Sequence, residues 1–333
     1  QRMLAGQPVR HLSTKALTKQ QYVRPDRCGL PDLYKYAHLL GPDNEITIAG
    51  YSETSRGCKH LCRHCPVVPA YGGRFFIVGV NVVLEDIDQQ GEMGARHITF
   101  GDPDFFNGVG HAVEIVRAVS REFSGLTYDV TIKIEHLRKH DDQLGVLRDT
   151  GCLFVVSAVE SIDDAVLTHF DKGHTQADFE QVVKRCREIG LTLAPTFIPF
   201  TPWTTVTGYH ELLRAIDRLQ LVDQVAPVQL TLRLLIPDRS RLLELDPRQL
   251  GATLERFDED RLVYPWRHFD LRVDQLQAVA AEIVGLRLKA SRDAVFDELW
   301  SLSAAQVGDA RRPRTPASRK RATVAYLNEP WYC

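Results

Sequence analysis

The chain has 333 residues, of which 44% are hydrophobic and 25% are charged, and its formal net charge is -2. This composition is typical of a globular protein with one large or two ordinary domains, and the near-neutral charge excludes a strong general attraction for nucleic acid or an anionic membrane. No apolar run approaches the ~18 residues of a membrane span and residues 1–19 lack the apolar segment of a signal peptide, so we expect a cytoplasmic protein.

Residues 1–45 contain several turn signals and predict a lead-in of irregular structure and helix. From residue 46 onward, apolar, β-branched runs alternate with amphipathic helical patterns. The runs cover residues 45–51, 96–100, 128–134, 152–158, 191–198 and 228–236. Six alternations predict a parallel sheet joined by right-handed crossovers, which is either an open doubly wound sheet or a barrel.

Two of these runs help to choose between the alternatives, because polar side chains alternate with apolar ones along them. Lys133 and Glu135 lie on the polar face of one run, and Arg233 lies on the polar face of another. A central strand of a doubly wound sheet is apolar on both faces, whereas a barrel that holds a polar ligand has one polar face. We therefore predict an α/β fold with a partial (β/α)6 TIM-like barrel over residues 46–236. An edge strand with a solvated face would give the same alternation.

The pattern changes after the predicted barrel. Residues 237–309 predict a mostly helical C-terminal extension with prolines at its breaks. Residues 310–333 predict a tail, in which a basic, proline-interrupted linker is followed by an apolar end that finishes at Cys333.

Three of the seven cysteines are clustered, with the spacing C-x3-C-x2-C directly after the first predicted strand. They are Cys58, Cys62 and Cys65, and the other four are Cys28, Cys152, Cys186 and Cys333. This distribution does not predict a disulfide framework, and clustered thiolates in a reducing compartment more often bind metal. A Cys3His zinc site that uses a neighbouring histidine is one possibility. Three cysteines with a fourth position left open also suit a cubane iron–sulfur cluster that binds a cosubstrate.

The stretch CKHLCRHC resembles the cysteine motif of the radical S-adenosylmethionine (SAM) superfamily, and the six βα units are similar to its partial barrel. The resemblance covers about residues 46–236. It implies that Cys58, Cys62 and Cys65 hold a [4Fe–4S] cluster whose open iron binds SAM. His64 stands where members of the family often place an aromatic residue before the third cysteine.

Further motifs fall in register with the same family. FGDPDFF is similar to its glycine-rich motif after the second strand, which implies that the methionine part of SAM is bound by Gly101, Asp102, Pro103 and Asp104, with a carboxylate from Asp102 or Asp104. The segment after the fourth strand implies a ribose or methionine contact from Ser157 or Glu160. Pro199 and Phe200 stand where many relatives place glycine, which is a departure from the motif of the fifth strand.

Several charged or reactive residues remain candidates for a role in catalysis. Lys133, Glu135 and Arg233 could grip the substrate, or could form a structural ion pair across the barrel. The ending LNEPWYC resembles the tail of the CUAEP/CCAEP-tail radical SAM group, which implies an active-site role for Cys333. We interpret His136 and His140 as surface or satisfied structural histidines.

The resemblance implies a radical SAM enzyme, an oxidoreductase or transferase that cleaves SAM reductively and abstracts a hydrogen atom from a small molecule or peptide. Its implied cofactors are the [4Fe–4S] cluster and SAM, and its implied partner is a flavodoxin- or ferredoxin-type reductant. We expect no membrane or nucleic-acid partner. The alternatives are a zinc-binding nucleic-acid or interaction module and an iron–sulfur electron-transfer protein.

Overall fold

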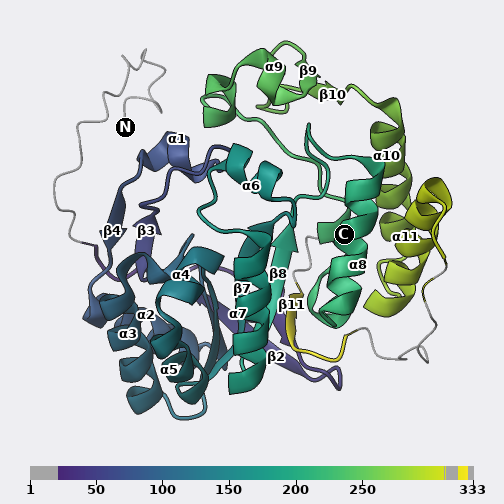
Figure 1. Cartoon of the computed structure of the whole chain (residues 1–333). Coiled ribbons are helices and arrows are strands. Elements are labelled where there is room, and N and C mark those ends of the chain that lie inside the picture. The colour runs from purple at the N-terminus through teal and green to yellow at the C-terminus, as the bar shows by residue number, and fades with distance from the viewer. Residues whose placement is uncertain (1–21, 311, 313–321, 329–333) are drawn as a thin grey trace, which may run out of the picture.

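A seven-stranded curled sheet forms the centre of the computed structural model, which describes residues 22–310, 312 and 322–328 (Figure 1). The order of its strands is β11-β1-β2-β5-β6-β7-β8. Five neighbouring strands run parallel: β2 (Ile46–Ser52), β5 (His97–Phe100), β6 (Thr127–Thr131), β7 (Cys152–Glu160) and β8 (Thr192–Phe197). The parallel, curled sheet confirms the predicted partial TIM-like barrel.

Helices follow the parallel strands in the chain and cover one face of the sheet. They are α2 (Val80–Glu92), α3 (Val109–Glu122), α4 (Ile134–Lys139), α5 (Leu144–Asp149), α6 (Asp164–Phe170), α7 (Gln176–Ile189) and α8 (Val206–Arg218), with short 3-10 helices η2 (Phe105–Gly108) and η3 (Asp141–Gln143). The side chain of Thr175 caps the start of α7, and Gly190 ends the helix in the left-handed conformation (φ 72°) that the sequence predicts there.

The two faces of the sheet differ in polarity. Ile98 and Val130 are fully buried in the core between sheet and helices. On the opposite face Asp129 accepts hydrogen bonds from Thr99 at 2.7 Å and pairs with His97 at 2.9 Å. This polar inner face agrees with the interior that the sequence pattern predicts for a barrel.

The last predicted strand differs from the structure. Residues 228–236 do not form a strand; they begin in the 3-10 helix η5 (Pro227–Leu230) and then make one parallel bridge, between Phe200 and Arg233. Pro199 has no backbone N–H to donate, so the ladder that β8 begins cannot continue across it. Within the described residues, the backbone hydrogen bonds between the two segments are those of Phe200 with Leu232 and Leu234, and the Phe197 N–H donates to the Gln229 side chain at 3.3 Å.

Segments from both ends of the described chain complete the other edge of the sheet. The 3-10 helix η1 (Leu33–Lys35) leads into β1 (His38–Leu40), which pairs antiparallel with β2 and also with β11 (Tyr326–Asn328). Because both pairings are antiparallel, β11 runs in the same direction as β2.

The residues after the sheet form a second, mainly helical layer that packs on α8. It contains η4 (Val222–Gln224), η6 (Arg241–Glu244), α9 (Pro247–Leu250), a hairpin of β9 (Ala252–Leu254) and β10 (Trp266–His268), α10 (Leu271–Leu286) and α11 (Arg292–Val307). Figure 1 shows α10 and α11 side by side with α8. No helix in the described part of the chain is long and apolar enough to cross a membrane.

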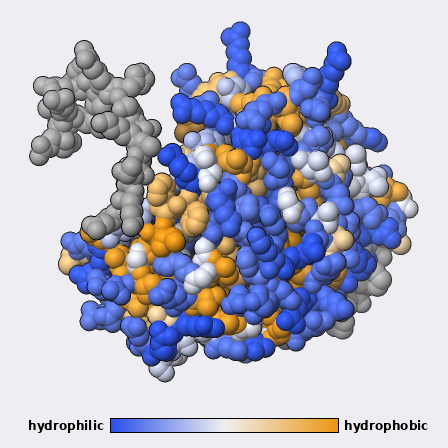
Figure 2. All heavy atoms as spheres, turned by 60° about the vertical axis from the view of Figure 1, so that its left-hand side comes forward, coloured by the Kyte–Doolittle hydropathy of each residue, from blue (hydrophilic) through white to orange (hydrophobic). Residues whose placement is uncertain are grey.

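A small hairpin outside the main sheet brackets the clustered cysteines. It pairs β3 (Ser55–Gly57) with β4 (Phe75–Ile77), and α1 (Val67–Tyr71) lies between them. The side of the molecule that carries this hairpin comes forward in Figure 2, where apolar residues gather among hydrophilic ones. Two apolar side chains of this region are about half exposed, Leu61 (45%) and Ile77 (48%).

Candidate functional site

The candidate site lies at the carboxyl edge of the parallel strands, where the loops after four strands meet. The cysteine loop follows β2, residues 101–108 follow β5, residues 132–135 follow β6, and residues 161–175 follow β7. In barrels of parallel strands the loops at this edge carry the chemistry. The cysteine loop contacts the other three through Asn107, Lys133 and Phe170.

The entry to the cysteine loop depends on a glycine. Gly57 has φ 81°, and a side chain there would meet the carbonyl oxygen of Arg74 at 2.4 Å. The Asn107 side chain holds the next residues, since its amide donates to Gly57 O at 3.4 Å and its carbonyl accepts from the Lys59 backbone at 3.3 Å. The thiol of Cys58 lies 3.7 Å from the same carbonyl oxygen. The cysteine loop is therefore held against the loop that follows β5.

The far end of the cysteine loop is tied to other parts of the fold. The backbone N–H of Arg63 donates to Phe170 O at 2.8 Å, at the end of α6. Ser240 donates to Arg63 O at 3.1 Å, and Arg241 donates to Leu61 O at 2.5 Å. The C-terminal layer thus helps to position the loop.

The three clustered thiols fit a metal cluster. None is in a disulfide; Cys62 is buried, and Cys58 and Cys65 are partly buried. Burial raises the pKa of Cys58 and of Cys65. At Cys58 a hydrogen bond from the backbone N–H of His60 opposes this increase. The Lys133 ammonium lies 3.7 Å from Cys62 Sγ. Three free thiols beside a cation, with backbone donors aimed at sulfur, form a donor set that suits an iron–sulfur cluster.

Asp102 is satisfied entirely by the segment that precedes the cysteines. Its carboxylate accepts from the backbone and hydroxyl of Thr54 at 2.9 and 2.8 Å and from the Ser55 hydroxyl at 2.6 Å. Burial raises the pKa of Asp102, and these hydrogen bonds act in the opposite direction. The side chain therefore positions the start of β3, which the sequence did not predict.

Asp104 lies instead between two histidines. Its Oδ2 is 2.7 Å from His136 Nδ1 and 3.5 Å from His60 Nε2, and its side chain is fully buried. Burial alone would raise the pKa of Asp104, but contact with His136 and His60 outweighs burial and holds the pKa well below its usual range. His136 is buried and faces this carboxylate, so the interpretation of it as a surface histidine is wrong.

The end of β7 carries a second buried cluster of charges. Glu160 has φ 67°, and its carboxylate contacts His64 at 3.1 Å and Lys172 at 3.2 Å. Burial alone would raise the pKa of Glu160, but Lys172 and His64 outweigh it and lower the pKa to about 2. Burial, with Lys172 and Lys133 nearby, lowers the pKa of His174 to about 4. A strained backbone at such a residue is typical of a functional site.

The other residues that the family resemblance implied lie close to these loops. Ser157 is fully buried, and its hydroxyl donates to Ile132 O at 2.6 Å, so it joins the ends of β7 and β6. Gly101 donates its backbone N–H to Ser52 O at 2.9 Å, directly before Asp102 and Pro103. His64, in the aromatic position, packs on Phe170 with ring centroids 4.3 Å apart.

The three charged residues predicted on strand faces divide into two groups. Lys133 and Glu135 form an ion pair of 3.1 Å beside Cys62, although they lie at the start of α4 and not on a strand. Arg233 is held by the C-terminal layer: it pairs with Asp274 at 2.7 Å and lies 3.6 Å from the ring centroid of Trp266. These contacts of Arg233 are those of a structural ion pair, the alternative to gripping the substrate, although the partner lies in the C-terminal layer and not across the barrel. Cys333 lies outside the described residues.

Sequence reasoning missed several residues of the site. Asn107, Lys172 and His174 were not candidates, and His60 was considered only as a zinc ligand within the cysteine motif. The sequence DKGHT, which contains Lys172 and His174, follows the strand that ends at Glu160. A lysine soon after an acidic strand end is a signal that could have identified Lys172 as its partner.

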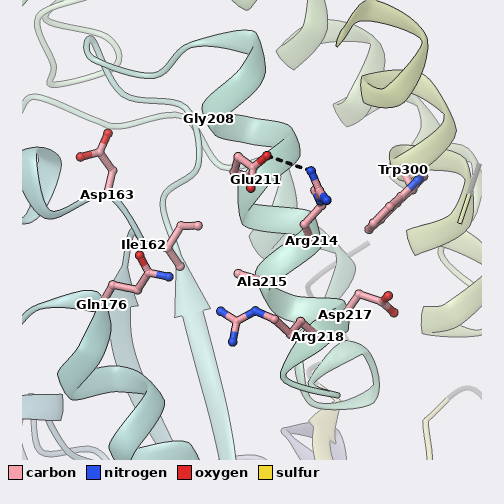
Figure 3. A pocket seen from close by; sticks show the side chains of 10 residues that line it. All are labelled: Ile162, Asp163, Gln176, Gly208, Glu211, Arg214, Ala215, Asp217, Arg218 and Trp300. Atoms are coloured by element: carbon pink, nitrogen blue, oxygen red, sulfur yellow. Dashed lines mark hydrogen bonds and ion pairs between the residues drawn. The ribbon is translucent and has the colours of Figure 1, made fainter. Parts of the chain in front are cut away.

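Two cavities lie away from the cysteines. The larger, of about 710 Å³, is on the helical layer and is lined by polar residues of α8 such as Glu211 and Arg214, together with Trp300 of α11 (Figure 3). A second, of about 400 Å³, lies between the lead-in and β2 and is lined by Tyr36, Tyr51 and Leu327 among others. Neither lining includes a clustered cysteine.

Comparison with known families and proteins identifies relatives of this chain. Residues 52–215 match the Radical SAM superfamily. The chain is 26% identical over 203 residues to the tRNA-2-methylthio-N(6)-dimethylallyladenosine synthase of Actinobacillus pleuropneumoniae, a match that covers 57% of this chain and 42% of that protein. It is 25% identical over 174 residues to the hopanoid C-3 methylase of Methylococcus capsulatus, covering 52% of this chain and 33% of that protein.

The chain thus spans less than half the length of these curated relatives. Among solved structures, the cobalamin-dependent S-adenosylmethionine radical enzyme OxsB with aqua-cobalamin and S-adenosylmethionine bound has a TM-score of 0.60 and 15% sequence identity, covering 72% of this chain and 41% of that one. At this identity the likeness concerns the fold.

Proposed function

We propose that this chain, whose residues 52–215 match the Radical SAM superfamily, binds a [4Fe–4S] cluster through Cys58, Cys62 and Cys65 and SAM at the same edge of the sheet. The observation that carries the proposal is the set of three free thiols in one anchored loop, with Lys133 at 3.7 Å from Cys62 Sγ. Members of this family use a [4Fe–4S] cluster and SAM, and the spacing leaves one corner of a cubane without a protein thiolate.

When bound, the cluster supplies the electron for reductive cleavage of SAM to methionine and a 5′-deoxyadenosyl radical. The chain's own residues orient and shield these groups. Lys133 provides positive charge beside Cys62, and backbone N–H groups of the loop stabilise thiolate sulfur. The buried ion cluster around Glu160 offers polar contacts at the end of β7, where we propose that the ribose or methionine part of SAM is bound.

Asp102 acts in this proposal as a positioning residue, because its carboxylate has three donors from Thr54 and Ser55. The backbone of Gly101 and Pro103 remains the proposed contact for the methionine part of SAM. Lys133 and Glu135 are the proposed catalytic candidates nearest to the thiols. Arg233 is proposed as a structural tie to α10, since its guanidinium is engaged by Asp274 and Trp266.

We propose hydrogen-atom abstraction from a small molecule or peptide as the overall reaction class, with a flavodoxin- or ferredoxin-type protein as reductant. The two relatives are named as a tRNA-2-methylthio-N(6)-dimethylallyladenosine synthase and a hopanoid C-3 methylase, so their names indicate different substrates. For this chain we therefore propose SAM cleavage followed by hydrogen-atom abstraction, and neither of these two group transfers.

The test is anaerobic reconstitution with iron and sulfide, followed by SAM and dithionite. We expect a brown protein with about four irons per chain that forms 5′-deoxyadenosine. Cys62→Ala should lose both the colour and the product, whereas the control Cys28→Ala, which changes an exposed cysteine outside the loop, should keep both. A colourless protein with one zinc per chain, or product from Cys62→Ala at the wild-type rate, would contradict the proposal.

A further inference from the structure

A second group of metal-binding side chains lies beside the cysteine loop. It consists of His60 in that loop, Asp104 after β5 and His136 in the first turn of α4. Each offers one ligand atom, and these atoms all lie within 4.8 Å of one another. Asp104 and His136 are 0% and 1% exposed, so the group faces the protein interior.

One oxygen of the Asp104 carboxylate has no hydrogen bond among the described residues, although two imidazoles lie near it. Its Oδ1 accepts from the Lys133 backbone at 3.4 Å. Its Oδ2 lies 2.7 Å from His136 Nδ1, yet within the described part of the chain neither of these two atoms has a hydrogen bond, so the contact lacks the geometry of one. A buried carboxylate oxygen without a hydrogen bond is costly, and a bound cation would satisfy it.

The His60 ring faces both partners with Nε2, whereas His136 faces His60 with Nε2 and Asp104 with Nδ1, so one of the two His136 nitrogens would bind an ion. His60 Nε2 and His136 Nε2 lie 3.2 Å apart, and His60 Nε2 lies 3.5 Å from Asp104 Oδ2. On the other side of the His60 ring, Nδ1 lies 3.7 Å from Glu135 Oε2. A carboxylate near Nδ1 favours a proton on that nitrogen, which leaves the Nε2 lone pair directed toward His136.

We propose that His60, Asp104 and His136 bind one divalent first-row transition-metal ion, such as zinc or ferrous iron, at a centre separate from the cysteine cluster. Metal–nitrogen and metal–oxygen bonds are about 2.0–2.2 Å, so two atoms bound to one ion lie about 3–3.5 Å apart, as the contacts of His60 do. Two imidazoles exclude the oxygen-preferring magnesium and calcium ions. Glu135 would orient His60 from its opposite nitrogen.

This inference goes beyond the proposed function, since it does not require the cluster. An ion at this position would join three segments: the cysteine loop, the loop after β5 and α4. Three protein ligands also leave at least one coordination position for water or another oxygen donor. The competing arrangement is a proton shared between the two imidazoles, which gives no metal binding.

The first test removes the competing thiols. In the full chain with Cys58→Ala, Cys62→Ala and Cys65→Ala, we titrate Co²⁺ as the probe and record its visible absorption. We expect one cobalt per chain, with ligand-field bands but without thiolate charge-transfer bands. Adding His136→Gln or Asp104→Asn should abolish this absorption. Adding the matched control His140→Gln, one turn further along the chain from His136, should leave it unchanged.

The second test keeps the cysteines and serves if the triple variant does not fold. The cluster-loaded wild-type chain is incubated with Zn²⁺ and dialysed, and zinc and iron are counted. We expect one zinc in addition to the cluster iron; His136→Gln should lose the zinc and keep the iron. Absence of additional zinc, or cobalt binding that survives both His136→Gln and Asp104→Asn, would overturn the proposal. Loss of cluster iron alone concerns only the proposed function.

Discussion

Three carboxylates at the carboxyl edge of the sheet are stabilised in three different ways. Neutral donors surround Asp102, two imidazoles contact Asp104, and an ammonium group with one imidazole contacts Glu160. Their chemistry follows from these partners and not from their residue type, since burial opposes ionisation of all three. Substitutions at single residues should therefore have distinct effects.

Asp102→Ala would remove the acceptor of three buried donors, the backbone N–H and hydroxyl of Thr54 and the hydroxyl of Ser55. Because each unsatisfied buried donor costs about 1–3 kcal/mol, we expect the free energy of unfolding of the cluster-free chain to fall by about 3 kcal/mol. Iron loading should fall as well, since β3 leads into the cysteine loop. Urea unfolding and an iron assay measure both. Asp88→Ala, at an exposed position of α2, is the control and should change stability by less than about 0.5 kcal/mol.

His174 should make stability depend on pH. Burial, Lys172 and Lys133 lower its pKa to about 4 in the folded chain, from an ordinary value of 6.5. As the pH falls below 6.5, His174 becomes protonated in the unfolded chain but stays neutral in the folded chain. The free energy of unfolding therefore decreases by about 1.4 kcal/mol per pH unit until the pH approaches 4.

The variant His174→Leu should lack this contribution. The difference in unfolding free energy between variant and wild type should therefore move in favour of the variant between pH 7 and pH 4.5, and it should be constant above pH 7.5. Urea unfolding at a series of pH values measures the difference. A constant difference across the whole range would show that His174 is protonated equally in both states.

At the scale of elements, one arginine joins α8 and α11. Arg312 contacts Asp217 of α8 and Asp293 and Asp297 of α11, each at 2.8 Å, and its side chain is only 9% exposed. The guanidinium also lies 4.9 Å from the ring centroid of Phe296. The single positive charge of the guanidinium reduces the repulsion among the three carboxylates.

Arg312→Gln should lower the free energy of unfolding by about 2 kcal/mol, because it leaves the three carboxylates without their common partner. Arg272→Gln is the matched control, since Arg272 forms an exposed pair with Asp270 that is worth about 1 kcal/mol or less. Thermal or urea unfolding measures both. Equal effects of the two substitutions would contradict this account.

The elements also show what local sequence patterns can predict. The parallel strands were predicted because each is a short apolar run between helical patterns. The run at 228–236 has the same appearance, but Pro199 in the neighbouring segment removes a donor, and η5 takes up the first residues of the run. Lys133 and Glu135 were placed at the site by the alternation of polar and apolar residues along a strand. They lie there because β6 ends at Thr131 and the chain then forms the start of α4.

At the scale of the whole molecule, the site is built from segments that are far apart in sequence. The cysteine spacing predicts a metal-binding loop, because its three thiols lie within eight residues, and the structure places this loop at the carboxyl edge of the sheet. The contact between His60, Asp104 and His136 depends on how three loops meet at the edge of the sheet. Spacing within one segment carries no information on such a contact.

Loading of the cluster should stabilise the whole chain. The thiols belong to a loop that is tied to α6 and to the C-terminal layer, so the iron–sulfur cluster should bind the folded chain and not the unfolded one. Such binding raises the free energy of unfolding by about 2.7 kcal/mol when the free ligand is at a hundred times its dissociation constant. We expect a higher melting temperature after anaerobic reconstitution and its reversal by a chelator. Cys62→Ala should melt at the same temperature with and without iron and sulfide.

The pairing of β1 with β11 has a consequence for biosynthesis. Leu39 and Leu327 are partners in this ladder, although nearly the whole chain separates them. During translation the parallel strands and the cysteine loop leave the ribosome long before β11 is made, so they can fold while the outer edge of β1 is still unpaired. An unpaired strand edge is prone to association with other chains. A nascent chain released before residue 326 should therefore aggregate more readily than the finished protein.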